Sequence, residues 1–331
     1  MRINCHFKLV AAILLLLTGV GSAVGAIPDV EREALIALYN STNGDNWTNK
    51  YNWLGPPGTE GTWYGVTLTG RGHVWKLYLD NNNLEGQIPP ELGNLKDLME
   101  LELSANQLSG HIPPQLGNLD RTYWLSLHHN QLSGSIPPEL GNIRVLMRLD
   151  LRANQLSGLI PPELGSRDLY LLALSANKLS GPIPPELGNL KELQSESVHI
   201  GYNALYTNDT SLRDFLNSKT KGGDWEGTQT ITPTDVTADS LSGDSIKVSW
   251  TPIRFTEFSG GYQVFYSTSS GGPYTLFGTT ADKKASFLTV TGLNPGTTYY
   301  FVVQTVTNPH DLNKNTVVSE FSEEASGSQR P

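Results

Sequence analysis

One phrase, LxLxxNxLxGxIPPxLG in its fullest copies, returns six times along this chain of 331 residues. Its asparagines are 23 to 26 residues apart and stand at Asn82, Asn106, Asn130, Asn154, Asn177 and Asn203. A fixed period of this length indicates a solenoid, in which every repeat forms one coil that packs only on its neighbours. The repeat therefore predicts a stacked domain whose usual function is to present a surface.

Two leucines around one variable residue indicate a short strand in each copy, beginning with Leu77 and Leu79. Side chains alternate along a strand, so both leucines point into the core and the residue between them points out. The pair recurs as Leu101 and Leu103, Leu125 and Leu127, Leu149 and Leu151, Leu172 and Leu174, and Val198 and Ile200. The stacked coils are therefore expected to form a parallel sheet over one continuous apolar column.

The asparagine of each copy follows the strand, where a buried amide can satisfy turn backbone that would otherwise lack partners. We assign it a structural role. Behind it come Leu-Ser-Gly, or Leu-Glu-Gly in the first copy, and then Ile-Pro-Pro, as at residues 112–114. Because proline lacks a backbone donor and fixes φ, this segment is predicted to join no regular ladder and to cross the convex side in extended or short helical turns.

The repeat phrase resembles the plant-type, or LxGxIP, class of leucine-rich repeat from about Val74 to Leu205. The resemblance implies an α/β solenoid with right-handed curvature, whose parallel sheet forms a concave face that binds partners. Members of this class often carry cysteines in a W-x-G-V-x-C cap. Residues 63–68 read WYGVTL here, so that disulfide is not expected.

Both ends of such a solenoid expose leucines and need caps. Residues 27–73 are predicted to form the first cap, with a helix that starts near Asp29 and a Gly-rich stretch that contains three tryptophans. The repeats and a second cap are expected over residues 74–228, where the segment SLRDFLNS (211–218) reads as a short amphipathic helix. The residues expected to seal the two ends are Ala34, Leu35, Leu38, Tyr39, Trp47, Trp53, Trp63, Leu212, Phe215, Leu216 and Trp225.

The composition changes near Thr230 to short alternating runs rich in Thr, Ser, Val and Tyr, which are typical of sandwich strands. Four such runs cover residues 246–250, 262–266, 287–290 and 299–306. The run from Leu293 through Tyr299 to Val303 resembles the tyrosine corner of a fibronectin type III domain, and Trp250 stands where that family keeps its core tryptophan. Residues 229–331 are therefore expected to be an all-β sandwich that acts as a spacer, with direct ligand binding as the alternative.

The first 26 residues read as a secretory signal peptide, with Arg2 and Lys8 before an apolar run and small residues at its end. Secretion or display at the cell surface is therefore expected. No later run approaches the roughly 20 apolar residues of a membrane span, so no membrane insertion is expected. The single cysteine, Cys5, precedes the apolar run, so neither a lipid anchor nor a disulfide framework is expected.

The formal net charge of −9 argues against nucleic acid as a partner. Capped ends argue against end-to-end stacking, so a monomer is expected. The cap sequence ALYNSTNGDNWT, the repeats and the sandwich together resemble secreted bacterial leucine-rich-repeat proteins.

Candidate binding residues occupy the outward strand positions, where the repeat imposes no residue type. Aromatic and arginine side chains dominate binding energy at interfaces, and Trp124 is the foremost candidate. The alternative is that Trp124 packs over a neighbouring strand while the charges only pair across the ladder. The predicted ligand-binding residues are Tyr78, Glu100, Glu102, Trp124, His128, Arg148, Asp150 and Arg152.

The same face contains residue types that catalysis and metal binding use. Ser126, His128 and Asp150 fall on adjacent strands, but a nucleophile needs a base within reach and a preorganised oxyanion site, which a shallow open sheet does not offer. His128 and His129 diverge along the chain, and His199 lies three coils away. No enzyme, metal or cofactor is therefore expected.

Three functions remain open from the sequence. The first is an exported, non-catalytic recognition protein that binds a protein, peptide or polysaccharide on the concave face. The second is a structural or adhesive element of the cell surface, whose repeats mainly provide length. The third is an inhibitor of a secreted carbohydrate-active enzyme.

Overall fold

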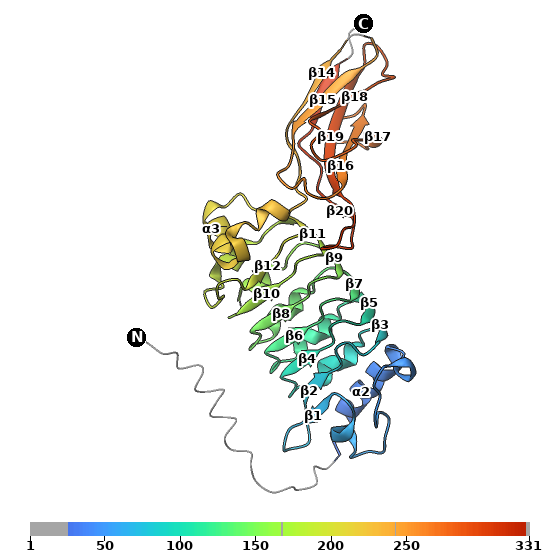
Figure 1. Ribbon diagram of the computed structural model, residues 1–331, viewed down its shortest axis with the longest axis vertical. Helices are drawn as coiled ribbons and strands as arrows, with labels where there is room; N and C mark the ends of the chain where they lie inside the picture. The colour runs from blue at the N-terminus through green and yellow to red at the C-terminus, as the bar shows by residue number, and fades with distance from the viewer. Residues whose placement is uncertain (1–25, 167, 242, 329–331) are drawn as a thin grey trace, which may run out of the picture.

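The chain forms two stacked bodies, a solenoid of coils and a β-sandwich that continues its long axis (Figure 1). The computed structural model describes residues 26–166, 168–241 and 243–328, so residues 1–25 of the expected signal peptide lie outside it. Among the described residues, no helix is both long and apolar enough to cross a membrane.

The coils share a seven-stranded sheet in the order β1-β2-β4-β6-β8-β10-β12, in which only β1 runs antiparallel. Leu77, Leu101 and Leu125 pair in register, and the later coils continue this row. The predicted strands are confirmed, and we call the outward side of this sheet the concave face. Its strands are β1 (Val66–Leu68), β2 (Val74–Tyr78), β4 (Glu100–Glu102), β6 (Trp124–Ser126), β8 (Arg148–Asp150), β10 (Leu171–Ala173) and β12 (Val198–His199).

The expectation that the segment behind each asparagine joins no ladder is wrong. Six short strands there form a second parallel sheet in the order β13-β11-β9-β7-β5-β3. The Leu-Ser-Gly residues keep their backbone donors, and in most coils pairing ends before the two prolines. These strands are β3 (Glu85–Gln87), β5 (Gln107–His111), β7 (Gln131–Gly134), β9 (Gln155–Gly158), β11 (Lys178–Pro182) and β13 (Ala204–Tyr206).

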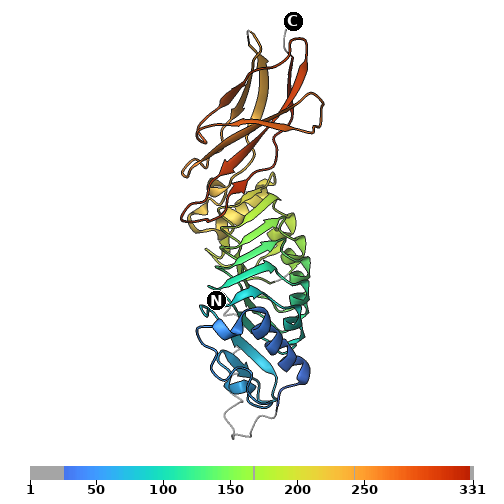
Figure 2. The same cartoon turned by 90° about the vertical axis from the view of Figure 1, so that its right-hand side faces the viewer.

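Short 3₁₀ helices follow, as predicted, and stack along one side of the solenoid (Figure 2). Each begins at the second proline of the repeat, where the missing donor would have had no intrahelical partner. They are η3 (Pro90–Asn94), η4 (Pro114–Asn118), η5 (Pro138–Asn142), η6 (Pro162–Ser166) and η7 (Pro185–Asn189).

The repeated asparagines form a ladder between coils. Asn130 Nδ2 donates to Leu103 O of the preceding coil and to Leu127 O of its own coil, both at 3.0 Å. Its Oδ1 accepts the Leu108 N–H at 3.0 Å. Asn130 is therefore a structural residue, and Asn106, Asn154, Asn177 and Asn203 repeat the pattern.

Residues at both ends of the solenoid pack into its apolar column. At the first end, α2 (Asp29–Ser41) buries Leu35 and Leu38, and the Trp47 and Trp53 rings lie 4.8 Å apart. At the second end, α3 (Thr210–Lys219) buries Leu212 and Leu216, and Trp225 is 1% exposed in the same core. Phe215 is only half-buried. The remaining short helices are η1 (Gly44–Asn46), η2 (Glu60–Thr62), η8 (Lys221–Gly223) and η9 (Glu226–Thr228).

The sandwich packs a three-stranded sheet, β14-β15-β18, against the sheet β17-β16-β19-β20, in which β21 also pairs with β19. All four predicted runs are strands. Trp250 is buried 5.0 Å from the Tyr262 ring, and the Tyr299 hydroxyl accepts the Asn294 N–H at 3.0 Å, as a tyrosine corner requires. The strands are β14 (Thr234–Ser240), β15 (Ile246–Thr251), β16 (Gly260–Ser267), β17 (Thr275–Thr279), β18 (Phe287–Val290), β19 (Thr298–Thr307), β20 (Val317–Val318) and β21 (Ala325–Ser328).

The two bodies are docked on one another, a point that the sequence left open. Thr230 and Thr307 share a hydrogen bond of 2.7 Å between their buried hydroxyl groups. The Tyr202 ring of the last coil lies 6.1 Å from the Phe255 ring of the sandwich. Polar and aromatic contacts therefore both join the solenoid to the sandwich.

Candidate functional site

The parallel register aligns the predicted binding residues in two rows on the concave face. One row contains Lys76, Glu100, Trp124 and Arg148, and the other contains Tyr78, Glu102, Ser126 and Asp150. Neighbouring parallel strands lie about 4.8 Å apart, so side chains of adjacent coils can touch. Six of the eight predicted residues lie on the strands β2, β4, β6 and β8. The other two, His128 and Arg152, lie in the turns that follow β6 and β8.

Glu100 lies at the base of a polar network. It is 4% exposed, because Tyr78, Tyr123 and Lys76 converge on its carboxylate. Both tyrosine hydroxyls donate to it, and Lys76 Nζ lies 2.6 Å from Oε1. The sequence placed Glu100 among exposed contact residues, but in the structure it supports the aromatic residues around it.

This network changes the acidity of its members. Burial, and then the hydrogen bond to the Glu100 carboxylate, raise the pKa of Tyr78 and of Tyr123. For Glu100 burial acts to raise the pKa, but the hydrogen bonds from Lys76, Tyr123 and Tyr78 outweigh it and lower the pKa. The tyrosines therefore stay neutral donors, and the carboxylate stays charged, at neutral pH.

Trp124 is half-buried, and the Arg148 guanidinium carbon lies 5.6 Å from the centre of its ring. This is a cation–π contact with the neighbouring strand β8. It agrees with the alternative in which Trp124 packs over a neighbouring strand. Arg148 itself is exposed, and none of the described residues forms an ion pair with it. The stacked pair therefore presents an aromatic edge and a cation that has no anion partner.

Glu102 lies one strand from Trp124 in the adjacent row. Its Oε1 atom is buried, yet no described residue donates a hydrogen bond to it. A carboxylate oxygen in that state is costly unless a donor reaches it. Arg148 on β8 and Glu102 on β4 therefore flank Trp124 on β6 with opposite charges. The Arg148 side chain is exposed, whereas Glu102 is half-buried with its Oε1 atom covered.

The predicted residues His128, Asp150 and Arg152 are already bound to neighbouring side chains. The Arg152 guanidinium donates two hydrogen bonds to the Asp150 carboxylate, from Nε to Oδ1 at 2.9 Å and from Nη2 to Oδ2 at 2.6 Å. Asp150 is 5% exposed. His128 and His129 contact one another through Nδ1 atoms 2.8 Å apart. Burial, and then His128 and Arg152, lower the pKa of His129. Asp150 thus fixes Arg152, whose side chain is 36% exposed.

The serine, histidine and aspartate of the weighed triad do not form a reactive set. Ser126 is 1% exposed, and the Asp150 carboxylate accepts its hydrogen bonds from Arg152. In the part of the chain that the structure describes, no three His, Cys, Asp or Glu residues are grouped to hold a metal ion.

The sequence reading missed one column of the face. Trp75, Met99, Tyr123, Met147 and Tyr170 stand directly before the first row and are joined by backbone hydrogen bonds, such as Tyr123 N to Met99 O at 2.9 Å. Tyr123 is the member that completes the Glu100 network. All five are large side chains at the repeat period, and that recurrence was the available signal.

The comparisons with known protein families agree with this architecture. Residues 73–95, 97–119, 122–143, 145–166 and 168–190 match the leucine-rich repeat, and residues 232–320 match the fibronectin type III domain. The chain therefore contains leucine-rich repeats followed by a fibronectin type III domain. The sixth coil, around Asn203, lies outside the matched segments but shares their ladder. No curated protein sequence matches the chain.

Solved structures of plant proteins are similar to part of this chain. One is the leucine-rich-repeat ectodomain of the receptor kinase GASSHO1/SCHENGEN3 from Arabidopsis thaliana, in complex with CASPARIAN STRIP INTEGRITY FACTOR 2. Its sequence is 35% identical and its TM-score is 0.50. The match covers 53% of this chain and 21% of the receptor chain. The BIR2 ectodomain from Arabidopsis thaliana is 29% identical, with a TM-score of 0.47. The match covers 55% of this chain and 95% of the BIR2 chain. A plant ice-binding protein is 29% identical, with a TM-score of 0.48 over 54% and 58%. The chain thus spans about a fifth of the first receptor ectodomain.

Proposed function

We propose that this chain is an exported, non-catalytic recognition protein that binds a protein or peptide on its concave face. One observation carries the proposal: Arg148 and Glu102 flank Trp124 with opposite charges that lack partners among the described side chains. Aromatic and arginine side chains surrounded by satisfied polar groups are typical of interface hot spots.

The chemistry of these groups favours a polypeptide ligand. Arg148 needs an anion or a strong acceptor, whereas Glu102 needs a cation or an N–H donor. A peptide supplies both, through side chains, termini and backbone, while Trp124 takes its apolar groups. A neutral polysaccharide offers hydroxyl groups and a ring face, but no charge for either residue.

The surrounding residues support the same proposal because they hold the patch in one conformation. Glu100 fixes Tyr78 and Tyr123 through hydrogen bonds, and Asp150 fixes Arg152. Side chains that are already ordered lose less conformational entropy on binding. The fibronectin type III domain, docked at the far end, acts in this proposal as a spacer.

The similarity to a receptor ectodomain that was crystallised with a partner adds support. The N-terminal sequence supports export, because its basic start, apolar run and small residues have the order of a signal peptide. Both arguments support a location of the repeats outside the cell, where a surface of this kind meets proteins and peptides.

The proposal is tested by capture of extracellular proteins on the immobilised chain of residues 27–331, followed by calorimetric titration of the captured partner. Trp124→Ala with Arg148→Ala is expected to raise the dissociation constant at least 100-fold, since a hot-spot residue contributes about 2 kcal/mol or more to the binding free energy. Thermal unfolding of the variant checks that it folds.

The matched control is Glu139→Ala with Glu163→Ala, two exposed residues of η5 and η6 outside the sheet. It should bind like the parent chain. Capture that survives the concave substitutions would contradict the proposal, and weak attachment insensitive to both variants would favour an adhesive element instead.

A further inference from the structure

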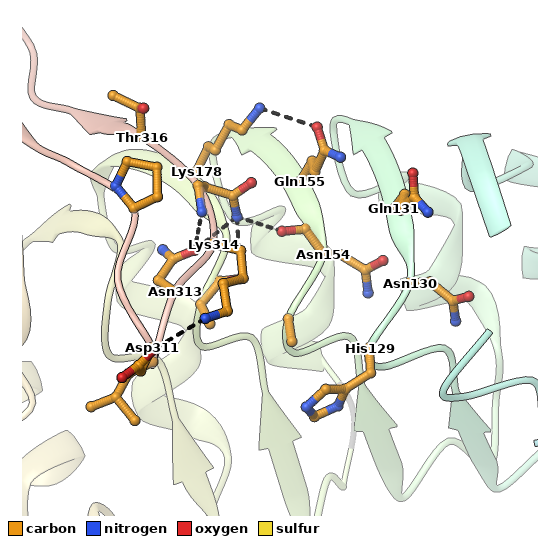
Figure 3. A pocket seen from close by; sticks show the side chains of 15 residues that line it. His129, Asn130, Gln131, Asn154, Gln155, Lys178, Asp311, Asn313, Lys314 and Thr316 are labelled. Carbon is orange, nitrogen blue, oxygen red and sulfur yellow. Dashed lines mark hydrogen bonds and ion pairs between the residues drawn. The ribbon is translucent and has the colours of Figure 1, made fainter. Parts of the chain in front are cut away.

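A loop of the sandwich lies along the rim of the solenoid, over the turns that contain the ladder asparagines. This loop, residues 308–316, joins β19 to β20. Its side chains Asn313 and Asn315 are only 2% and 8% exposed. Figure 3 shows Asn313 and Lys314 beside Lys178 and Asn154 of the solenoid, with Asn130 and Gln131 further along the row.

The two loop asparagines bind the rim in the same way, one coil apart. Asn315 Nδ2 donates to Asn154 O at 2.6 Å and lies 3.5 Å from Ala176 O. Asn313 Nδ2 donates to Asn177 O at 3.0 Å and to Tyr202 O at 2.8 Å. Each amide thus contacts two backbone carbonyl groups on consecutive coils. One belongs to the ladder asparagine of the first coil, and the other to the residue just before the ladder asparagine of the next coil.

Both ends of the carbonyl row are also occupied. Asn82 O accepts the Thr48 N–H of the first cap at 3.0 Å, and Asn203 O accepts the Thr230 N–H of the linker at 2.8 Å. Asn106 O and Asn130 O remain, and no described residue donates a hydrogen bond to either. Two acceptors in the middle of the row are therefore open.

A groove of about 640 Å³ lies where the loop ends and the open part of the row begins. His129, Asn130 and Gln131 line it on the solenoid side, and Asp311 and Lys314 line it on the loop side (Figure 3). Lys314 Nζ lies 3.3 Å from Asp311 Oδ1. The groove thus combines one of the open residues, Asn130, with a paired charge at one end.

We propose that this groove is a second binding site, separate from the concave face, for an extended polypeptide whose donor side chains stand two residues apart. The loop sequence Asn313-Lys314-Asn315 shows that this spacing serves consecutive coils. Because the row offers carbonyl oxygens, asparagine, glutamine or serine side chains fit it and carboxylates are repelled.

The probe is a fluorescent synthetic peptide that copies residues 308–317, NPHDLNKNTV, titrated against the chain of residues 27–331. The peptide is expected to bind weakly, with a dissociation constant that rises at least tenfold when both of its central asparagines are alanine. This comparison needs no change in the protein.

Gln131→Trp places a large side chain in the groove at an exposed position and should also weaken binding at least tenfold. Gln87→Trp, exposed in the first strand of the same sheet, is the matched control and should bind normally. Trp124→Ala with Arg148→Ala should bind the peptide normally too, which separates this site from the concave face.

Several results would overturn the proposal. These are no binding, equal binding of the alanine peptide, or equal binding by Gln131→Trp with its fold intact by circular dichroism. Direct binding of a neutral oligosaccharide such as cellohexaose, together with failure of the peptide to bind, would identify a glycan site instead.

Discussion

Replacing the buried carboxylate of Glu100 by an amide tests whether the concave face is held in one conformation by its polar network. Glu100→Gln keeps the shape of the side chain and one acceptor oxygen. It removes the charge that Lys76 Nζ approaches to 2.6 Å, and it turns an NH₂ group towards either the Tyr78 or the Tyr123 hydroxyl, because the two tyrosines donate to different carboxylate oxygens. At least one of the three hydrogen bonds must be lost.

The expected cost follows from the kind of bond and its exposure. A hydrogen bond to a charged group contributes about 1.5–3 kcal/mol. The Lys76 side chain is 25% exposed and regains water when its partner is neutralised, so its share is reduced. We expect Glu100→Gln to lower the free energy of unfolding by about 2 kcal/mol at pH 7.

The effect must also depend on pH with a definite sign. Burial alone would raise the pKa of Glu100, but its hydrogen bonds lower the pKa in the folded chain. A carboxyl group with a lowered pKa contributes stability above its unfolded pKa of about 4.3 and loses it as the pH falls through the folded value. The difference between parent and variant should therefore shrink below about pH 4.

Urea unfolding at pH 7 and pH 3, followed by tryptophan fluorescence, measures this difference. Every tryptophan except Trp250 lies in the solenoid or its caps, so the signal reports that body. Glu139→Gln, an exposed change on η5, is the control. Equal stability of Glu100→Gln and the parent at pH 7, or an undiminished difference at pH 3, would refute the reasoning.

Two further predictions concern the interior. Asn130→Ala removes its ladder bonds to Leu103, Leu127 and Leu108 and should cost about 3 kcal/mol in urea unfolding; a cost below about 0.5 kcal/mol would contradict the ladder. Burial lowers the pKa of Lys283 to about 8, so the unfolded chain binds more protons between that pH and about 10.5 and stability rises there with pH. Calorimetry of Lys283→Met should show a flatter pH dependence than the parent, and parallel curves would contradict this assignment.

Features set by the repeat period could be predicted from the sequence. Leu77, Leu101 and the later leucines face the core, and the asparagines form a ladder, because each coil meets the same neighbours. The second sheet does not follow from the repeat, because the two prolines lack backbone donors and predict a segment outside any ladder. Pairing uses the residues before them.

Features set by side-chain reach between coils could not be predicted. Glu100 is buried because Tyr123, 23 residues away, extends its hydroxyl over the carboxylate. The loop contacts of Asn313 and Asn315 join residues 136 and 161 positions apart in the chain, for which no local pattern exists. The same holds for the partnerless oxygen of Glu102, which depends on what its neighbours fail to reach.

Hydroxyl-radical footprinting of the chain with its captured partner tests recognition on the concave face, because this face contains oxidisable tryptophan, tyrosine and methionine side chains. Binding there should protect Trp124, Tyr78 and Met147 from oxidation. Oxidation should not change at Tyr51 of the first cap or Phe287 of the sandwich, which are 70% and 51% exposed. Oxidation of Trp124 that is unchanged by the partner, with protection confined to the cap or the sandwich, would contradict recognition on the concave face.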